Sequence, residues 1–260
     1  MAVPARPAST VVLVRPAEQG WETYLLRRSA QSPLLADLWV FPGGTLRADD
    51  LGPEAERLFG PRSAELARAL LSRDTGAPPP APVESLAYFA AAARELFEEA
   101  GVLPGAGAAW PTSEELAELR TAVERGRAFH EVATELGASL SLDHFVYYAH
   151  WTTPEALPQR FDTRFFLARM PDDEEATPSP YEMAEGVWIG VGAALERAKA
   201  RELPLHFATV NHLRRLAPFN DVDELFAFAR HKPVVPVMPN TRETDGRVVP
   251  FLPSELEGVW

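Results

Sequence analysis

Runs of apolar residues predict several β-strands. Residues 9–17 and 21–29 are rich in β-branched and aromatic residues, and a short turn at Gly20 separates them. This pattern predicts a β-hairpin. Residues 38–44 predict a third, short strand that ends in a Pro-Gly-Gly turn. Later in the chain, further strands are expected at residues 141–154, 160–171 and 183–190.

The strongest helical pattern covers residues 83–101. This stretch is rich in Ala, Leu and Glu and stops at Gly101, a common residue just beyond a helix end. A second helical stretch, residues 112–137, opens with a cap that resembles Ser-x-x-Glu. Three more helices are expected at about 191–202, 205–217 and 221–230. The order predicts an α/β (α+β) fold without the steady strand-helix alternation of a doubly wound sheet.

Two segments do not fit the pattern of regular strands and helices. Residues 49–82 contain two short helical runs and a proline-rich linker, which we interpret as a helical insertion. From Pro233 onward, prolines recur and no hydrophobic period is clear. We expect this tail to lie along the surface or to contact another subunit. The predicted organisation is one domain over residues 1–231 and a C-terminal tail over 232–260.

Composition and charge exclude several classes of function. The 260 residues carry a formal net charge of −12, which is unfavourable for binding a nucleic-acid backbone. The chain contains no cysteine, so disulfides, thiolate catalysis and cysteine-based zinc sites are excluded. No apolar run approaches the ~18 residues of a membrane span, and the "VVLV" core near the start is too short for a signal peptide. We therefore expect a cytoplasmic protein without membrane partners.

Three acidic residues crowd one face of the helix predicted at 83–101. Glu95, Glu98 and Glu99 have the i, i+3, i+4 spacing that places side chains together. Taken alone, this spacing favours a solvated helix face. However, the cluster lies at the C-terminal end, where the helix dipole disfavours negative charge. Clustered carboxylates are also the ligands that Mg²⁺ and Mn²⁺ prefer, so the cluster is a candidate metal site.

The same stretch resembles the Nudix box. The family pattern is G-x5-E-x7-R-E-U-x-E-E-x-G-U, where U is a bulky aliphatic residue. Residues 94–102, "RELFEEAGV", match its second half, and "FPGG" at 41–44 is similar to the strand and turn that open it, with Gly44 as the first glycine. The resemblance implies a Nudix fold, a mixed β-sheet sandwiched between helices, here with a helical insertion and extra C-terminal helices.

The box departs from the family pattern in its length. Between Gly44 and Arg94 there are 49 residues, about 36 more than the pattern has, and they correspond to the predicted insertion. Counting back from Arg94 places Leu86 where the pattern has its first glutamate, and Glu84 is out of register. On this count the first glutamate of the box is missing.

An interrupted box resembles the coenzyme A diphosphatase-like branch of the family. Residues 25–50 resemble its signature, which runs from Leu-Leu-x-x-Arg-Ser through Phe-Pro-Gly-Gly to an Asp, here Asp50. The signature's His-x-Gly is absent, and Arg47 stands where an Asp is expected. Residues 160–166 are similar to the branch's Arg-Phe-x-Thr-x-Phe-Phe run. Residues 205–213 receive no role from the sequence.

The resemblance implies hydrolysis of a pyrophosphate bond in a nucleoside diphosphate linked to another moiety, by water and with Mg²⁺ or Mn²⁺ bound. The implied metal site comprises Glu95, Glu98, Glu99 and Gly44. Arg94 would position the glutamates, and Glu182 is the candidate general base, with Glu185 as a second choice. The candidate substrate-binding residues are Arg28, Gly43 and Arg164, since arginine pairs readily with phosphate.

Three functions stay open at this point. The first is a diphosphatase for coenzyme A or an acyl-coenzyme A. The second is a Nudix pyrophosphatase for ADP-ribose, NADH or another nucleotide. The third is a catalytically silent, nucleotide-sensing Nudix-fold domain, which the intact set of glutamates argues against. The expected partner is a small nucleotide diphosphate, and the insertion and the tail are candidate surfaces for a homodimer.

Overall fold

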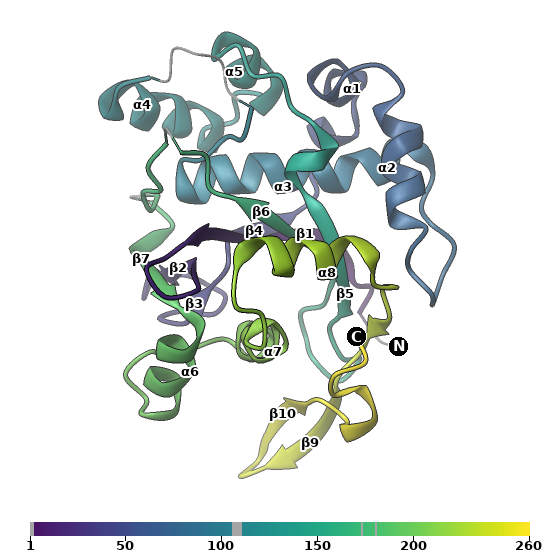
Figure 1. Ribbon diagram of the computed structural model, residues 1–260, viewed down its shortest axis with the longest axis vertical. Helices are drawn as coiled ribbons and strands as arrows, with labels where there is room; N and C mark the ends of the chain where they lie inside the picture. Colours follow the sequence, from purple (N-terminus) through teal and green to yellow (C-terminus); the bar gives the residue numbers. More distant parts are fainter. Residues whose placement is uncertain (1–2, 106–110, 173, 180) are drawn as a thin grey trace.

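The computed structural model of the protein describes residues 3–105, 111–172, 174–179 and 181–260. Its centre is one mixed eight-stranded β-sheet with helices on both faces (Figure 1). This arrangement confirms the expected α/β (α+β) fold class, a mixed sheet sandwiched between helices. No helix in the described residues is both long enough and apolar enough to cross a membrane.

The sheet has the strand order β3-β2-β1-β6-β5-β8, with β4 paired to β1 and β7 paired to β2. The strands are β1 (Arg6–Pro16), β2 (Trp21–Arg28), β3 (Trp39–Val40), β4 (Gly43–Thr45), β5 (Val146–Thr152), β6 (Phe161–Arg169), β7 (Met183–Gly190) and β8 (Pro236–Val237). β1 and β2 form the predicted hairpin, whereas the strand expected at 38–44 is divided into β3 and β4. β1 runs parallel to β6 at the centre. Side chains of β1 alternate between the two faces of the sheet, so Val11 and Leu13 join one hydrophobic cluster and Val12 and Val14 join the other.

One face of the sheet is covered by α3 (Pro82–Ala100), which ends at Gly101 in the left-handed conformation as expected. The insertion packs beside it and contains α1 (Pro53–Phe59) and α2 (Ser63–Leu71) (Figure 1). The helix expected at 112–137 is two helices, α4 (Ser113–Glu124) and α5 (Phe129–Glu135), because Gly126 between them has φ 101. Thr112 and Glu115 form the predicted capping box of α4.

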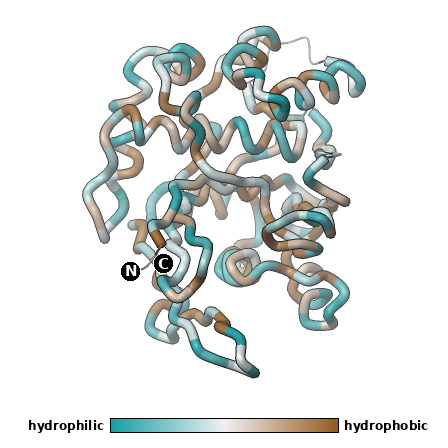
Figure 2. The backbone as a smooth tube through the Cα atoms, turned by 180° about the vertical axis from the view of Figure 1, so that it is seen from behind, coloured by the Kyte–Doolittle hydropathy of each residue, from teal (hydrophilic) through white to brown (hydrophobic). Residues whose placement is uncertain are grey.

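The other face carries α6 (Val191–Lys199), α7 (Phe207–Leu216) and α8 (Val222–His231) (Figure 1). Seen from behind, hydrophobic and hydrophilic residues alternate along the helical segments around the sheet (Figure 2). This alternation is typical of helices that bury one side. The helices α6, α7 and α8 are each buried in part, whereas α3 is buried on all sides from Ser85 to Ala100. The positions expected for the three C-terminal helices agree with the structure.

The segment after Pro233 is more ordered than its proline content predicts. β8 extends the sheet by pairing in parallel with β5, and the hairpin of β9 (Asn240–Thr244) and β10 (Arg247–Phe251) extends from the body (Figure 1). Trp260, with 2% of its surface exposed, packs against the ring of Trp151 at a centroid distance of 4.8 Å. The segment therefore does not lie only on the surface.

The insertion is fastened to the sheet by a buried histidine between two aspartates. His150 on β5 hydrogen-bonds through Nδ1 to Asp74 Oδ2 at 2.6 Å and through Nε2 to Asp162 on β6. Arg164 also contacts Asp162, at 3.1 Å. Burial alone would lower the pKa of His150, but its hydrogen bonds to Asp162 and Asp74 outweigh burial and raise it. The same hydrogen bond from His150 helps to lower the pKa of Asp162 to about 2 against the effect of burial.

This geometry predicts a loss of stability above neutral pH. A histidine whose pKa is raised by folding contributes stability that is fully present below its unfolded pKa, about 6.5, and is lost as pH rises through the folded value. The free energy of unfolding should therefore fall, as pH rises above about 6.5, more in the wild type than in His150→Gln. Urea unfolding of both proteins across this range measures the difference. Identical pH profiles would show that His150 is not charged in the folded protein.

Candidate active site

The Gly-Gly turn and the C-terminal end of α3 meet at the glutamates. The backbone N–H of Gly43 donates to Glu99 Oε2 at 2.8 Å. A Cβ atom at Gly44 would overlap the carboxylate of Glu95, and one at Gly43 would lie 2.6 Å from the carbonyl oxygen of Ser9. Both positions therefore need glycine for the close approach of chain segments. The two halves of the predicted box are in contact despite the insertion between them.

Arg94 holds this contact together from a fully buried position. Its Nη1 donates to Glu95 Oε1 at 2.7 Å and lies 3.5 Å from both carboxylate oxygens of Glu98. Its Nη2 donates to the carbonyl oxygen of Thr45 at 2.9 Å. Arg94 thus contacts two of the glutamates and the segment that follows the glycine turn, and its role in positioning the glutamates for catalysis stays a prediction.

Asp50 is the acidic partner that the sequence count missed. It accepts two hydrogen bonds from Arg94, to Oδ1 at 3.0 Å and to Oδ2 at 2.9 Å, and is 4% exposed. The expectation that the box lacks its first acid is therefore wrong. Counting forward from Gly44 by the pattern G-x5-E places Asp50 at the position of the first glutamate, whereas counting back from Arg94 crosses the insertion and falls on Leu86.

Glu98 is held differently from the other two glutamates. Arg47 forms a bidentate pair with it, at 2.7 and 2.9 Å. Arg120 of α4 donates two hydrogen bonds to the carbonyl oxygen of Glu98, at 3.1 and 2.8 Å. This buried guanidinium offsets the unfavourable negative charge at the end of α3. Within the residues that the structure describes, no three acidic or histidine side chains converge in a way that already forms a metal-binding cluster.

The three carboxylates are nevertheless suited to a hard divalent cation. They are 6%, 6% and 3% exposed, so they do not form the solvated face that their spacing alone favoured. Burial raises the pKa of Glu95 to about 7 and raises that of Glu98. Burial, and then repulsion by Glu95, raises the pKa of Glu99 well above its ordinary value. Buried carboxylates of this kind keep their charge when a cation compensates it, and Arg47 does so in part for Glu98.

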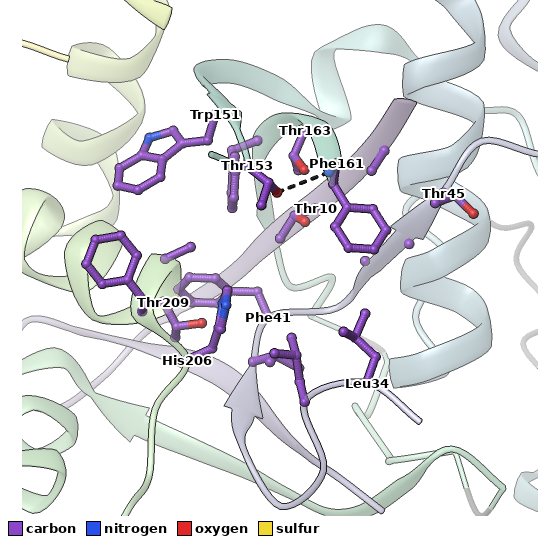
Figure 3. Close-up of a pocket in the computed structure, with 18 of the residues that line it drawn as sticks. Thr10, Leu34, Phe41, Thr45, Trp151, Thr153, Phe161, Thr163, His206 and Thr209 are labelled. Atoms are coloured by element: carbon purple, nitrogen blue, oxygen red, sulfur yellow. Dashed lines mark hydrogen bonds between the residues drawn. The ribbon is translucent and has the colours of Figure 1, made fainter. Parts of the chain in front are cut away.

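A cavity of about 380 Å³ opens beside Glu95 and Glu99. One side, here called the glutamate wall, comprises Gly43, Gly44, Thr45, Glu95 and Glu99. The opposite side, here called the α7 wall, comprises Trp151, His206, Phe207, Ala208 and Thr209. Figure 3 shows members of the two walls, with Thr45 on one side and Trp151, His206 and Thr209 on the other. Thr10 of β1 and Phe161 and Thr163 of β6 lie between the two walls (Figure 3).

Besides Glu95 and Glu99, the predicted residues Arg28 and Glu182 reach this cavity. Arg28 lines it and places Nη1 3.6 Å from Glu99 Oε1. Glu182 also lines it, at 3.9 Å from Arg28 Nη2, with 52% of its side chain exposed. Glu185, by contrast, pairs with Arg27 on the surface at 3.2 Å. The geometry therefore favours Glu182 over Glu185 as a group facing a substrate.

Arg164 does not reach the cavity. Side chains alternate along β6, so Thr163 and Phe165 face the cavity while Arg164 faces the α3 side. There it lies over the ring of Tyr88, 5.1 Å from the centroid, and pairs with Asp162. The prediction that Arg164 binds substrate is not supported by this placement. Residues 205–213, which contribute most of the α7 wall, match no sequence motif that indicates a ligand.

Comparison with known proteins agrees with this geometry. Residues 5–216 match the NUDT19 Nudix domain family. The chain is 29% identical over 247 residues to human acyl-coenzyme A diphosphatase NUDT19, covering 82% of this chain and 65% of the human protein. It is also 29% identical over 243 residues to the Gallus gallus protein of the same name, covering 80% and 64% respectively. The chain thus spans slightly less than two-thirds of these relatives.

The fold has a counterpart among solved structures. The NUDIX hydrolase from Alicyclobacillus acidocaldarius superposes with a TM-score of 0.70 at 24% identity, covering 86% of this chain and 96% of that one. This likeness confirms the predicted fold, and the family match confirms the resemblance to the Nudix box and to the coenzyme A diphosphatase-like branch. The chain belongs to the NUDT19 branch of the Nudix family.

Proposed function

We propose that this protein hydrolyses the pyrophosphate bond of a nucleoside diphosphate linked to another moiety, with coenzyme A and acyl-coenzyme A as the substrate class. The observation that carries the proposal is the pair of buried carboxylates, Glu95 and Glu99, that open into a cavity beside the glycine turn. The names of the human and chicken relatives support the substrate class.

Glu95, Glu98 and Glu99 would hold Mg²⁺ or Mn²⁺, with the side-chain-free backbone of Gly44 beside them. Bound divalent cations neutralise the pyrophosphate charge and lower the pKa of bound water. The protein groups do the positioning. Arg94 fixes the glutamates through the contacts to Glu95, Glu98 and Asp50 described above. A buried and restrained set of this kind needs little rearrangement when a phosphate charge arrives.

Glu182 is the proposed general base. It lines the cavity and is half exposed, so its carboxylate has access to water as well as to substrate. Arg28 lies between Glu182 and Glu99 and places its guanidinium where it can pair with a phosphate oxygen. In this arrangement Glu182 takes a proton from the attacking water, and Arg28 binds the anionic substrate.

Arg47 is expected to compete with the cation for Glu98. The Arg47 side chain is 41% exposed, so its ion pair with Glu98 contributes about 1 kcal/mol or less. Arg47→Gln should therefore lower the Mg²⁺ concentration that gives half-maximal activity by up to about fivefold. Activity at saturating coenzyme A across a Mg²⁺ series measures this. Arg57→Gln, in an exposed pair on the insertion, is the control. An unchanged or higher Mg²⁺ requirement in Arg47→Gln would contradict the competition.

The function is tested by offering the purified protein several substrates with Mg²⁺ or Mn²⁺. Coenzyme A, an acyl-coenzyme A, ADP-ribose, NADH and a dinucleoside polyphosphate make up the set, with products separated by chromatography. Release of 3′,5′-ADP and a phosphopantetheine product supports the proposal. Turnover of ADP-ribose or NADH alone would assign a different Nudix substrate. Binding of a nucleotide without turnover of any substrate would indicate a silent, nucleotide-sensing domain.

A further inference from the structure

The α7 wall presents the N-terminal end of a ten-residue helix to the cavity. His206 is the residue before the first helical turn, and Phe207, Ala208 and Thr209 form that turn. The first N–H groups of an α-helix have no acceptor within the helix and carry partial positive charge. In α4 and α8 the side chains of Thr112 and Asp221 accept such hydrogen bonds. In α7 no side chain caps the helix, and its first turn contains no acidic residue.

Thr209 adds a buried donor at this end. It is 2% exposed, yet its hydroxyl has no hydrogen-bond partner among the described residues. Other helical threonines behave differently: the hydroxyls of Thr121 and Thr134 donate to the carbonyl four residues earlier, each at 2.7 Å. Thr209 lines the cavity, and Figure 3 shows its hydroxyl on the cavity side of α7. Its hydroxyl is therefore available to a ligand in the cavity.

The groups at the α7 wall favour direct binding of an anion, in contrast to the glutamates, which would bind an anion only through a metal ion. The carboxylates that line the cavity belong to Glu95 and Glu99 on α3 and to Glu182 just before β7, and α7 itself contains no acidic residue. His206 is expected to be neutral at pH 7, because burial lowers its pKa to about 4, and a neutral imidazole still has one N–H to donate. Helix N–H groups, a hydroxyl and an imidazole form a set of donors of the kind that binds phosphate.

We infer that the N-terminal end of α7, with the Thr209 hydroxyl, is a subsite for a phosphate monoester on the substrate, separate from the pyrophosphate at the glutamates. This inference rests on the proposed function. Coenzyme A carries a phosphate ester on its ribose in addition to its pyrophosphate, so a substrate with its pyrophosphate at the glutamate wall has a second phosphate to place. The opposite wall offers donors for it. The subsite would thus distinguish coenzyme A from nucleotides that lack the 3′-phosphate.

Binding of two product-like nucleotides tests the subsite directly. Adenosine 3′,5′-bisphosphate and adenosine 5′-monophosphate differ only in the 3′-phosphate, and neither contains a pyrophosphate bond that the protein could cleave. Calorimetry with Mg²⁺ present should show that the wild type binds the bisphosphate at least about 10-fold more tightly, as expected for hydrogen bonds to a charged group. Thr209→Val should remove most of this preference and leave the affinity for the monophosphate unchanged.

Matched variants separate the subsite from a structural effect. Thr209→Ser keeps the hydroxyl and should keep the preference, as should Thr134→Val, an exposed change on α5. Ala208→Asp places a carboxylate in the first helical turn, where it stabilises the helix, and should abolish the preference by repulsion. Equal binding of both nucleotides by the wild type, or a preference that survives in Thr209→Val, would overturn the subsite.

The proposed function and the subsite fail in different ways. Hydrolysis of coenzyme A without any preference for the bisphosphate would retain the function and overturn the subsite. A Thr209-dependent preference without hydrolysis of coenzyme A would support the subsite and refute the function. Inorganic phosphate serves as a third probe, in competition with the bisphosphate. If phosphate competes equally well in the wild type and in Thr209→Val, the subsite recognises the nucleotide-linked ester and not the free ion.

Discussion

Glu98→Gln is expected to lower kcat/KM for coenzyme A at least about 100-fold, because Glu98 is a proposed metal ligand and such a ligand contributes several kcal/mol to transition-state stabilisation. The change keeps the size of the side chain but removes its charge and replaces one acceptor oxygen by an NH2 donor. The fold should stay intact, since Arg120 binds the backbone carbonyl of residue 98 and not its carboxylate. Steady-state kinetics and thermal unfolding, carried out side by side, measure both effects.

Glu118→Gln is the matched control, because this residue is also a helical glutamate but is exposed on α4. It should leave both kinetics and unfolding unchanged. Arg47→Gln is a second control, since Glu98→Gln also weakens the pair with Arg47. If Glu98→Gln retained most of the activity, the assignment of Glu98 to the metal site would be wrong. A loss that Arg47→Gln reproduced in full would instead assign the effect to the ion pair.

The second large effect is expected for stability. Replacing Arg94 by methionine should lower the free energy of unfolding by about 3–5 kcal/mol, because it leaves buried carboxylates without their counter-charge. Asp50 at 4% exposure and Glu95 at 6% would both lose a close partner. Urea unfolding in the presence of a chelator measures this change without a contribution from bound metal.

The double variant Arg94→Met/Asp50→Leu tests the cause. If the loss comes from an unpaired buried charge, removing the aspartate as well should recover part of the stability. Arg57→Met serves as the control, because the Arg57 side chain is 74% exposed. No recovery in the double variant would show that the packing of the Arg94 side chain matters more than its charge.

Local sequence patterns predicted the central features of the site. The composition of residues 83–101 and the position of Gly101 fixed the helix, and the i, i+3, i+4 spacing placed the glutamates together. The crowding of acid at a helix end indicated an unusual role, and the structure shows those side chains buried. Each of these inferences depends on neighbours within one or two helical turns, which sequence spacing describes well.

Features that depend on distant segments were missed or misassigned. Asp50 meets Arg94 only because the insertion folds back, so the count back from Arg94, which crosses the insertion, misses it. Strand alternation predicts that Thr163 and Arg164 face opposite sides of the sheet. Which of the two sides borders the cavity depends on the packing around the whole sheet, and it is the side of Thr163. Trp260 is buried by long-range packing that the prolines before it do not reveal. None of these contacts leaves a periodic signal in the chain.

The division of the box also has a consequence for folding kinetics. Asp50 and Arg94 are 44 residues apart in sequence. Their contact can form only when the insertion between them has folded back. Each doubling of loop length costs only about 0.6 kcal/mol at equilibrium, but contacts that are distant in sequence slow folding. α3 can form from local interactions before this loop closes. During refolding, helical circular dichroism should therefore recover ahead of enzymatic activity, and the interval between them would report how long the insertion takes to reach its place.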